Sequence, residues 1–120
     1  MIITGGVYWW NNHPWIIISN LGHSSGDLLI VNLTSLDEEC PDDECVLANS
    51  DYSWIKHPTA VAFSRAKRVG EREFAAAVMQ GQLREGDPKV ISVECLNKIR
   101  KAALTSKQLG KRNAALLSSS

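Results

Sequence analysis

Two short segments place an imidazole next to a proline, and they are the parts of the chain best suited to acid–base chemistry. His13 stands before Pro14 and a strongly apolar run, and Lys56-His57-Pro58-Thr59 groups a cation, a second imidazole and a hydroxyl. Imidazole titrates near neutral pH and can therefore give or take a proton. If His13 and His57 meet in the fold, they supply an acid and a base. The sequence equally allows the plainer roles of a loop histidine and of a histidine hydrogen-bonded to backbone.

Other residues have the chemistry to hold a phosphate. Thr34 lies at the end of a predicted strand, where its hydroxyl can reach a phosphate oxygen, although threonine is also a good strand former. The segment Ser64-Arg65-Ala66-Lys67-Arg68 follows another predicted strand and offers three cations to a nucleic-acid backbone. The alternative for this segment is a solvated basic loop.

The cysteines do not form a metal-binding pattern. Cys40 and Cys45 have four residues between them and His57 follows, but a fourth ligand and the usual two-residue spacing are missing. No family signature surrounds Cys45 as a nucleophile. We therefore predict that the protein uses neither a metal nor a cofactor. We also expect its three cysteines to be reduced thiols.

Length and composition predict one globular domain over residues 1–120. Hydrophobic residues make up 44% and charged residues 22% of the chain, which is ordinary for a soluble protein. No apolar run approaches the roughly 18 residues that span a bilayer, and the N-terminus lacks the pattern of a signal peptide, so we expect a cytoplasmic protein with no membrane contact.

The net charge of zero hides a strong asymmetry along the chain. Residues 1–55 have a formal charge of −8, and residues 56–120 have a formal charge of +8. Such polarity suits either a C-terminal surface that faces nucleic acid or complementarity between the two halves within the fold.

The first half of the chain is typical of strands. Val7-Tyr8-Trp9-Trp10, residues 15–19, residues 28–34, a short piece at 45–47 and residues 60–63 are rich in β-formers. The second and third of these runs are continuously apolar, and we expect a hairpin of two central strands buried on both faces. Residues 36–44 are expected to form an acidic loop with solvated charges, and residues 51–59 an irregular segment.

Helical patterns dominate the end of the chain. Residues 71–80 place Phe74 and Val78 on one face before Gly81, which suits a helix C-terminus. Ser92 is a good N-cap for a helix with a stripe of apolar residues that ends near Ala103. Ser106 is predicted to cap a further helix that buries Leu109, Leu116 and Leu117.

These features together resemble the PemK/MazF-like toxin family. The resemblance is carried by His13-Pro14-Trp15-Ile16-Ile17-Ile18-Ser19, by Val31-Asn32-Leu33-Thr34-Ser35, and by the closing helix from Ile91 to Leu104. It covers residues 1–36 and 90–104, and residues 106–117 look like a helical extension. The resemblance implies an α+β fold: a small SH3-like, partly open β-barrel with a helix after the middle strands and one or two C-terminal helices. It further implies a homodimer that cleaves single-stranded RNA without a metal, and an antitoxin partner that neutralises it.

One departure from the family concerns the presumed active site. Family members usually have Arg before the proline, and this chain has His13. Imidazole can act as an acid or a base but holds a phosphate less well than the two-pronged guanidinium group. On this interpretation His13, Thr34 and His57 are catalytic, and the substrate is bound by Lys56, Thr59, Ser64 and Arg65.

A second hypothesis is a non-catalytic module on the same barrel. The four tryptophans Trp9, Trp10, Trp15 and Trp54 are mostly expected in a core or an interface, but one or two exposed rings would stack on unpaired bases or contact a protein partner.

Overall fold

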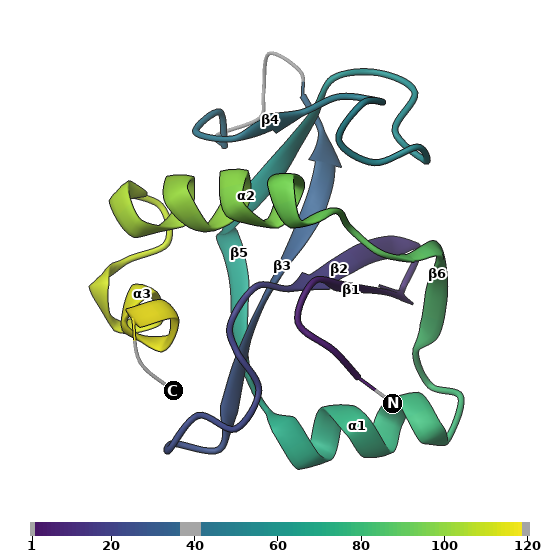
Figure 1. Cartoon of the computed structure of the whole chain (residues 1–120), viewed down its shortest axis with the longest axis vertical. Helices are drawn as coiled ribbons and strands as arrows, with labels where there is room; N and C mark the ends of the chain where they lie inside the picture. Colours follow the sequence, from purple (N-terminus) through teal and green to yellow (C-terminus); the bar gives the residue numbers. More distant parts are fainter. Residues whose placement is uncertain (1, 37–41, 119–120) are drawn as a thin grey trace.

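In the part of the chain that the structure describes, six antiparallel strands form a sheet that curls into a half-barrel, and three helices pack around it (Figure 1). The computed structural model describes residues 2–36 and 42–118. The order of strands in the sheet is β4-β5-β3-β2-β1-β6. The elements are β1 (Gly6–Trp10), β2 (His13–Ile17), β3 (Asp27–Ser35), β4 (Val46–Leu47), β5 (Thr59–Gly70), α1 (Glu71–Met79), β6 (Arg84–Val90), α2 (Val93–Thr105) and α3 (Lys111–Ser118). The predicted α+β, SH3-like partly open barrel is therefore confirmed.

A two-residue turn joins β1 to β2 and fixes the start of β2. Asn11 and Asn12 have φ values of 50° and 65°, the left-handed pair that a type I′ hairpin turn requires. Asparagine tolerates this conformation better than other residues with side chains. Trp10 and His13 consequently face each other as the last pair of the hairpin.

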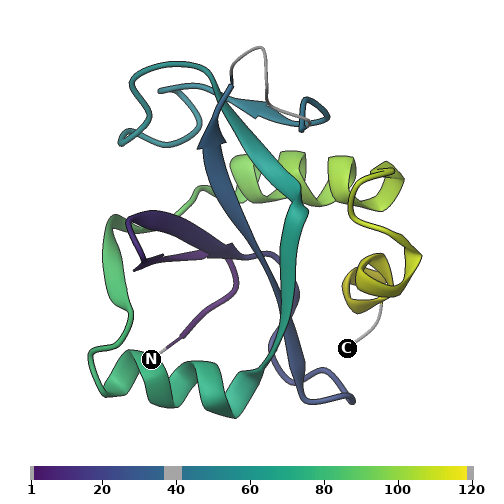
Figure 2. The same ribbon diagram turned by 180° about the vertical axis from the view of Figure 1, so that it is seen from behind.

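The central strands β2 and β3 are buried on both faces, as their unbroken apolar sequences predict. Along β2, Trp15 and Ile17 pack on one side, and Ile16, with Ile18 just after the strand, packs on the other. The larger core lies between the sheet and the helices α2 and α3, and the smaller one lies against α1 through Phe74. In Figures 1 and 2, α2 crosses the sheet on one side while α1 lies at the end of β5.

The strand β5 is much longer than its sequence suggested. We predicted a strand over residues 60–63 followed by a basic loop, and the prediction of a loop was wrong, because β5 runs from Thr59 to Gly70 and pairs with β3 along its length. The pairing shifts between Ile30 and Asn32, so the ladder is irregular where the two parts of β5 meet. In the second part of β5, the cations are exposed, Ala66 packs against the larger core and Val69 packs against the smaller one.

The edge strand β6 was not predicted. Gly86 is its only buried residue, and the other positions hold four charged side chains, Pro88 and the exposed Val90. Such a sequence lacks the alternation of a half-buried strand, and a proline is tolerated because β6 pairs on one side only, with β1. The close approach that fixes β6 is at Gly86, where a Cβ atom would lie 2.9 Å from Tyr52 Oη and 2.9 Å from Val7 Cγ1.

The helix ends follow the predicted signals with one exception. Gly81 follows α1 with a φ of 79°, and Ser92 caps α2 by accepting the Cys95 N–H at 3.0 Å. Ser106, however, does not cap α3. It ends α2, and its Oγ accepts the N–H groups of Gln108 and Leu109 in an intervening turn. Leu109, Leu116 and Leu117 are buried as predicted. None of the helices in the described ranges combines the length and apolarity needed to cross a membrane.

Candidate functional site

Four of the seven residues selected from the sequence line one cavity of about 260 Å³. These are His13, Thr34, His57 and Thr59, and they come from the start of β2, the end of β3, the segment before β5 and the start of β5. The remaining lining residues are Asn12, Pro14, Leu33, Ser35 and Trp54. Residues far apart in the sequence thus bring two imidazoles and several hydroxyls to one place, which is the arrangement that acid–base chemistry requires.

The two histidines are held in different ways. The Asn11-Asn12 turn places His13 at the first position of β2, where its ring is exposed and has no hydrogen-bond partner among the described residues. His57 Nε2 lies 2.9 Å from Ser35 Oγ, so its ring is oriented by the end of β3. One imidazole is therefore fixed and the other is free to meet a ligand.

Thr59 holds the backbone next to His57. Its side chain is buried, and its Oγ1 donates to the His57 carbonyl oxygen at 2.9 Å. The single hydroxyl proton is used in this bond, so in the observed geometry Thr59 supports the turn and has no proton to donate to a phosphate. Thr34, which is half-buried at the end of β3, is the hydroxyl better suited to that role.

Lys56, Ser64 and Arg65, the other residues selected for substrate binding, do not line this cavity. The Lys56 Nζ donates to the Ser53 carbonyl oxygen at 3.3 Å, and Arg65 is an exposed residue of β5. Ser64 is engaged by Asp42, whose carboxylate accepts its N–H at 2.9 Å and its Oγ–H at 2.5 Å. Asp42 is only 1% exposed, so the expectation that all charges of the acidic segment are solvated was wrong for this residue.

Sequence reasoning did not single out Ser35 or Asn12, and it placed Trp54 only among the tryptophans. Trp54 is 41% exposed, lines the cavity and packs edge-on against Trp9 with ring centroids 4.9 Å apart. The signal for Ser35 was its place beside Thr34 at the end of an apolar run. Its partner His57 is 22 residues away, and no local pattern indicates that contact.

The two cysteines in the described ranges do not line this cavity. Cys45 and Cys95 are free and buried in the larger core, and burial raises the pKa of both thiols, that of Cys95 to about 11. Cys40 lies outside the described residues. Within residues 2–36 and 42–118 no group of three or more His, Cys, Asp or Glu side chains is placed to hold a metal ion.

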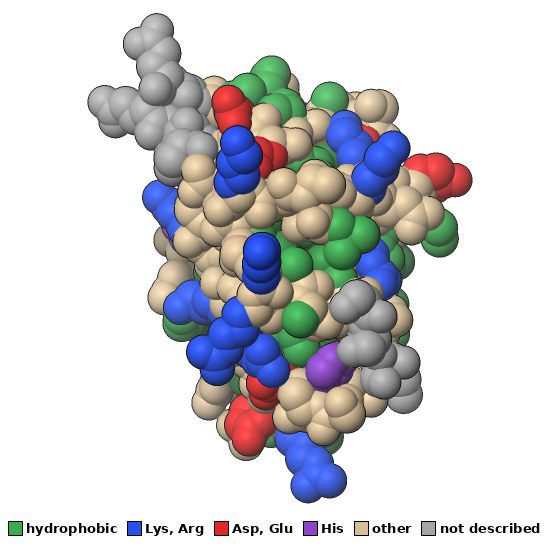
Figure 3. Space-filling model, turned by 90° about the vertical axis from the view of Figure 1, so that its left-hand side faces the viewer, with side chains coloured by type: hydrophobic (Ala, Val, Ile, Leu, Met, Phe, Trp, Pro, Cys, Tyr) green, Lys and Arg blue, Asp and Glu red, His purple; other side chains and the backbone are tan. Residues whose placement is uncertain are grey.

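The charge asymmetry is partly used inside the fold. Asp27 pairs with Arg68 at 2.7 Å and Asp51 with Lys98 at 3.1 Å, so acids of the first half meet cations of the second. Even so, Lys and Arg side chains are spread over the face that carries α3 (Figure 3). A hollow of about 590 Å³ between β5 and α3 is lined by Arg68 and Arg112 among others. Both explanations of the charge pattern therefore have a structural counterpart.

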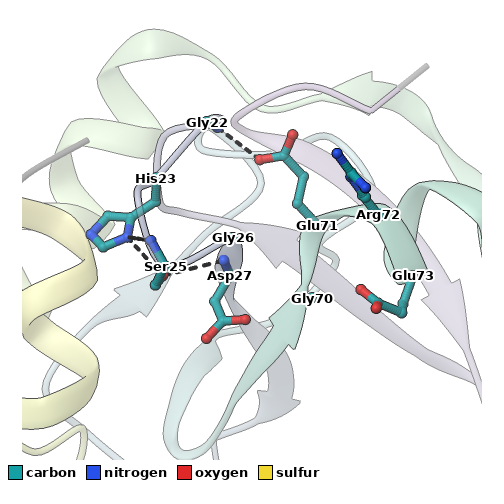
Figure 4. Close-up of a pocket in the computed structure, with 9 residues that line it drawn as sticks. All are labelled: Gly22, His23, Ser25, Gly26, Asp27, Gly70, Glu71, Arg72 and Glu73. Atoms are coloured by element: carbon teal, nitrogen blue, oxygen red, sulfur yellow. Dashed lines mark hydrogen bonds between the residues drawn. The ribbon is translucent and has the colours of Figure 1, made fainter.

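Another hollow, of about 610 Å³, lies at the β2–β3 turn and the start of α1. Figure 4 shows hydrogen bonds among several of its polar groups: His23 Nδ1 lies 2.7 Å from Ser25 Oγ, and Glu71 accepts the Gly22 N–H at 2.7 Å. The Ser25 N–H also donates to His23 Nδ1. These contacts stabilise a turn, and we assign the hollow no chemistry.

No model of a known protein family matches this chain, and a search of curated proteins finds no significant match.

Proposed function

We propose that this protein is a toxin-like endoribonuclease of the PemK/MazF type, which cleaves single-stranded RNA at the cavity between β2, β3 and the segment before β5. The observation that supports the proposal is the convergence of His13, His57 and Thr34 on one small cavity. The resemblance of residues 1–36 and 90–104 to that family also supports the proposal, and the SH3-like barrel agrees with it.

The proposed reaction is an attack by the ribose 2′-oxygen on the neighbouring phosphorus. One imidazole takes the 2′-hydroxyl proton as the new O–P bond forms, and the other imidazole gives a proton to the departing 5′-oxygen. The products are a 2′,3′-cyclic phosphate and a 5′-hydroxyl end. The Thr34 hydroxyl donates a hydrogen bond to a phosphate oxygen, and Ser35 keeps the His57 ring in place.

The replacement of the usual arginine by His13 has a consequence for binding in this scheme. A guanidinium group would hold the phosphate with two parallel hydrogen bonds, whereas imidazole offers one. Phosphate affinity then depends more on hydroxyls and on cations outside the cavity, such as Lys56 next to His57.

The test is incubation of purified protein with a long single-stranded RNA in the presence of EDTA, followed by sequencing of the ends. We expect discrete cuts with 5′-hydroxyl ends, lost by at least about 100-fold in His13→Ala and His57→Ala, because each removes one proton-transfer step. The matched control is His23→Ala, a histidine in a structural turn. Intact RNA, or cuts that survive both substitutions, would refute the proposal and leave the non-catalytic module as the alternative.

A second substrate separates the acid from the base. Replacing the bridging 5′-oxygen by sulfur gives a leaving group that needs no proton. The histidine variant whose activity returns with this substrate lacks the acid, and the variant that stays inactive lacks the base. Failure of the sulfur substrate to rescue either variant contradicts the assignment of a histidine pair.

The homodimer and the antitoxin partner are proposed on the resemblance alone. Light scattering of the purified protein measures the first. The second is tested by expressing the protein in bacteria. If expression arrests growth and His13→Ala relieves the arrest, the host of this protein needs an antitoxin.

A further inference from the structure

Two further cavities adjoin the candidate site around the tip of the β1–β2 hairpin. The cavity of about 260 Å³ that contains His13 and His57 shares Asn12 with a hollow of about 460 Å³, which is also lined by Trp9 and Arg84. That hollow shares Trp10 and Gln82 with a third cavity of about 330 Å³. The three cavities therefore follow one another around the turn that carries His13.

The third cavity, which we call the tryptophan cavity, has an apolar lining with a single cation. Its walls include Trp10, Trp15 and Phe74, and the Lys67 Nζ lies 5.4 Å from the Trp10 ring and 5.9 Å from the Trp15 ring. Trp10 is 42% exposed, whereas Trp15 is only 5% exposed. A flat aromatic ligand would find here an accessible ring to stack on, and a negative charge at the rim would find an ammonium group.

Trp15, which lines the tryptophan cavity, has a buried donor without a partner among the described residues. Its Nε1–H is shielded from solvent and forms no hydrogen bond within residues 2–36 and 42–118, and the Oδ1 of Asn32, the residue opposite Trp15 in β3, is likewise unpaired there. Buried polar groups of native proteins are nearly always hydrogen-bonded, so each exception calls for an explanation. An aromatic heterocycle that carries ring nitrogens or carbonyl oxygens is a ligand able to supply an acceptor after a small adjustment of the indole.

We propose that the tryptophan cavity binds a nucleobase of the RNA strand whose scissile phosphate lies between His13 and His57. The strand passes around the hairpin tip, with its backbone along the hollow that holds Arg84, and Lys67 contacts a phosphate at the rim of the tryptophan cavity. This inference rests on the proposed function and specifies its substrate: an RNA strand that continues from the scissile phosphate around the β1–β2 hairpin to the tryptophan cavity. Base stacking tolerates any sequence, because every base has a flat face.

The contiguity of the three cavities favours a strand over a free nucleotide. A mononucleotide would need only the tryptophan cavity, whereas the shared residues Asn12, Trp10 and Gln82 link that cavity to the histidines. Cations are present on this route, Arg84 in the middle hollow and Lys67 beyond it. A strand with several phosphates can contact both cations, which lie in different cavities, whereas a mononucleotide in the tryptophan cavity has no phosphate for the second cavity.

The test uses an RNA hexamer methylated on every 2′-oxygen, which binds but cannot be cleaved by the proposed reaction. Binding is measured by fluorescence anisotropy of a 5′-labelled hexamer. We expect Trp10→Ala to weaken binding about tenfold, since stacking on one aromatic side chain contributes about that factor or more. Lys67→Gln should weaken binding and reduce its dependence on salt concentration. Lys89→Gln is the matched control, because Lys89 is a cation of β6 that lines none of the three cavities.

Separate outcomes distinguish this inference from the proposed function. His13→Ala should abolish cleavage of ordinary RNA, whereas the loss of hexamer binding caused by Trp10→Ala should be the same factor in the His13→Ala background as in the wild type. Unchanged binding by Trp10→Ala and Lys67→Gln overturns the inference even if RNA is cut at the histidines. A mononucleotide that binds as tightly as the hexamer, and depends on Trp10 in the same way, also overturns it. Binding that depends on Trp10 without any cleavage supports the inference and refutes the proposed function.

Discussion

The edge strand β6 depends on Gly86, and a single methyl group there tests how closely it is packed. A Cβ atom at this position would lie 2.9 Å from Val7 Cγ1, 2.9 Å from Tyr52 Oη and 3.1 Å from the Pro88 carbonyl oxygen. Contacts below 3.0 Å force neighbours to move, and such overpacking costs about 1–3 kcal/mol. Tyr52 Oη also donates to the Pro88 carbonyl at 2.7 Å, a bond that contributes about 1 kcal/mol and that the methyl group would displace. We expect Gly86→Ala to lower the free energy of unfolding by about 2–4 kcal/mol.

Tyr52→Phe gives the complementary change. It removes the hydroxyl, and thus one close neighbour of the new Cβ and the hydrogen bond to Pro88, and alone it should cost about 1 kcal/mol. Gly86→Ala should then cost about 1 kcal/mol less in the Tyr52→Phe background than in the wild type. This coupling is the quantity that a double-mutant cycle isolates.

The assay is urea denaturation followed by tryptophan fluorescence, with linear extrapolation to water. Gly81→Ala is the control, since Gly81 has a φ of 79° and nothing within 4 Å of a new Cβ. Its cost of about 1–2 kcal/mol should be the same with and without the Tyr52 hydroxyl. The reasoning fails if Gly86→Ala is as stable as the wild type, or if its cost does not depend on Tyr52.

Three further expectations concern buried thiols and helix ends. Burial raises the pKa of the Cys95 thiol to about 11 and also raises that of the Cys45 thiol. In a Cys40→Ala protein, both thiols should therefore resist Ellman's reagent at pH 8 until guanidinium unfolds the chain. Rapid reaction in the native state would contradict their burial. The hydrogen bond from the Ser106 hydroxyl lowers the pKa of Glu44, so the ionised carboxylate stabilises the fold above its unfolded pKa and stops doing so as the pH falls through its folded pKa. Glu44→Gln should therefore lower the free energy of unfolding by less than about 1 kcal/mol at pH 7 and not at all in strong acid. A difference in stability that persists in acid would exclude this cause. Ser92→Ala should lower the free energy of unfolding by about 1 kcal/mol, whereas Ser92→Thr should preserve most of it, as urea denaturation will show.

Much of the fold could be predicted because several signals are local. The continuous apolar runs predict strands buried on both faces, and Ser92 and Gly81 mark helix ends through contacts within a few residues. The strand β6 gave no such signal, since an edge strand with one buried glycine is held by a neighbour and not by its own hydrophobicity. The second part of β5 was missed for the same reason: its exposed cations suggest a loop, and its pairing with β3 is a long-range contact.

The candidate site was predictable as a set of residue types but not as a geometry. His13 and His57 were selected because imidazole beside proline is suited to a rigid, accessible position, and both line the same cavity. The hydrogen bond between Ser35 and the His57 ring, and the bond from the Thr59 hydroxyl to the His57 carbonyl, depend on how β3, β5 and the intervening segment meet. Ser64 shows the converse, because a hydroxyl beside basic residues looks available for a phosphate, whereas a buried aspartate occupies it.

The two-residue turn at Asn11 and Asn12 also limits how this chain can change over evolutionary time. Because side chains alternate along a strand, inserting a single residue while keeping a two-residue turn would send Trp15 and Ile17 into the core now filled by Ile16 and Ile18, and would turn His13 to the opposite side of the sheet. An insertion at this hairpin should therefore be tolerated only where the turn itself lengthens and the pairing of β1 with β2 is kept. Connections such as the one between β2 and β3, which end in glycine-bearing turns at the surface, are free of that restriction.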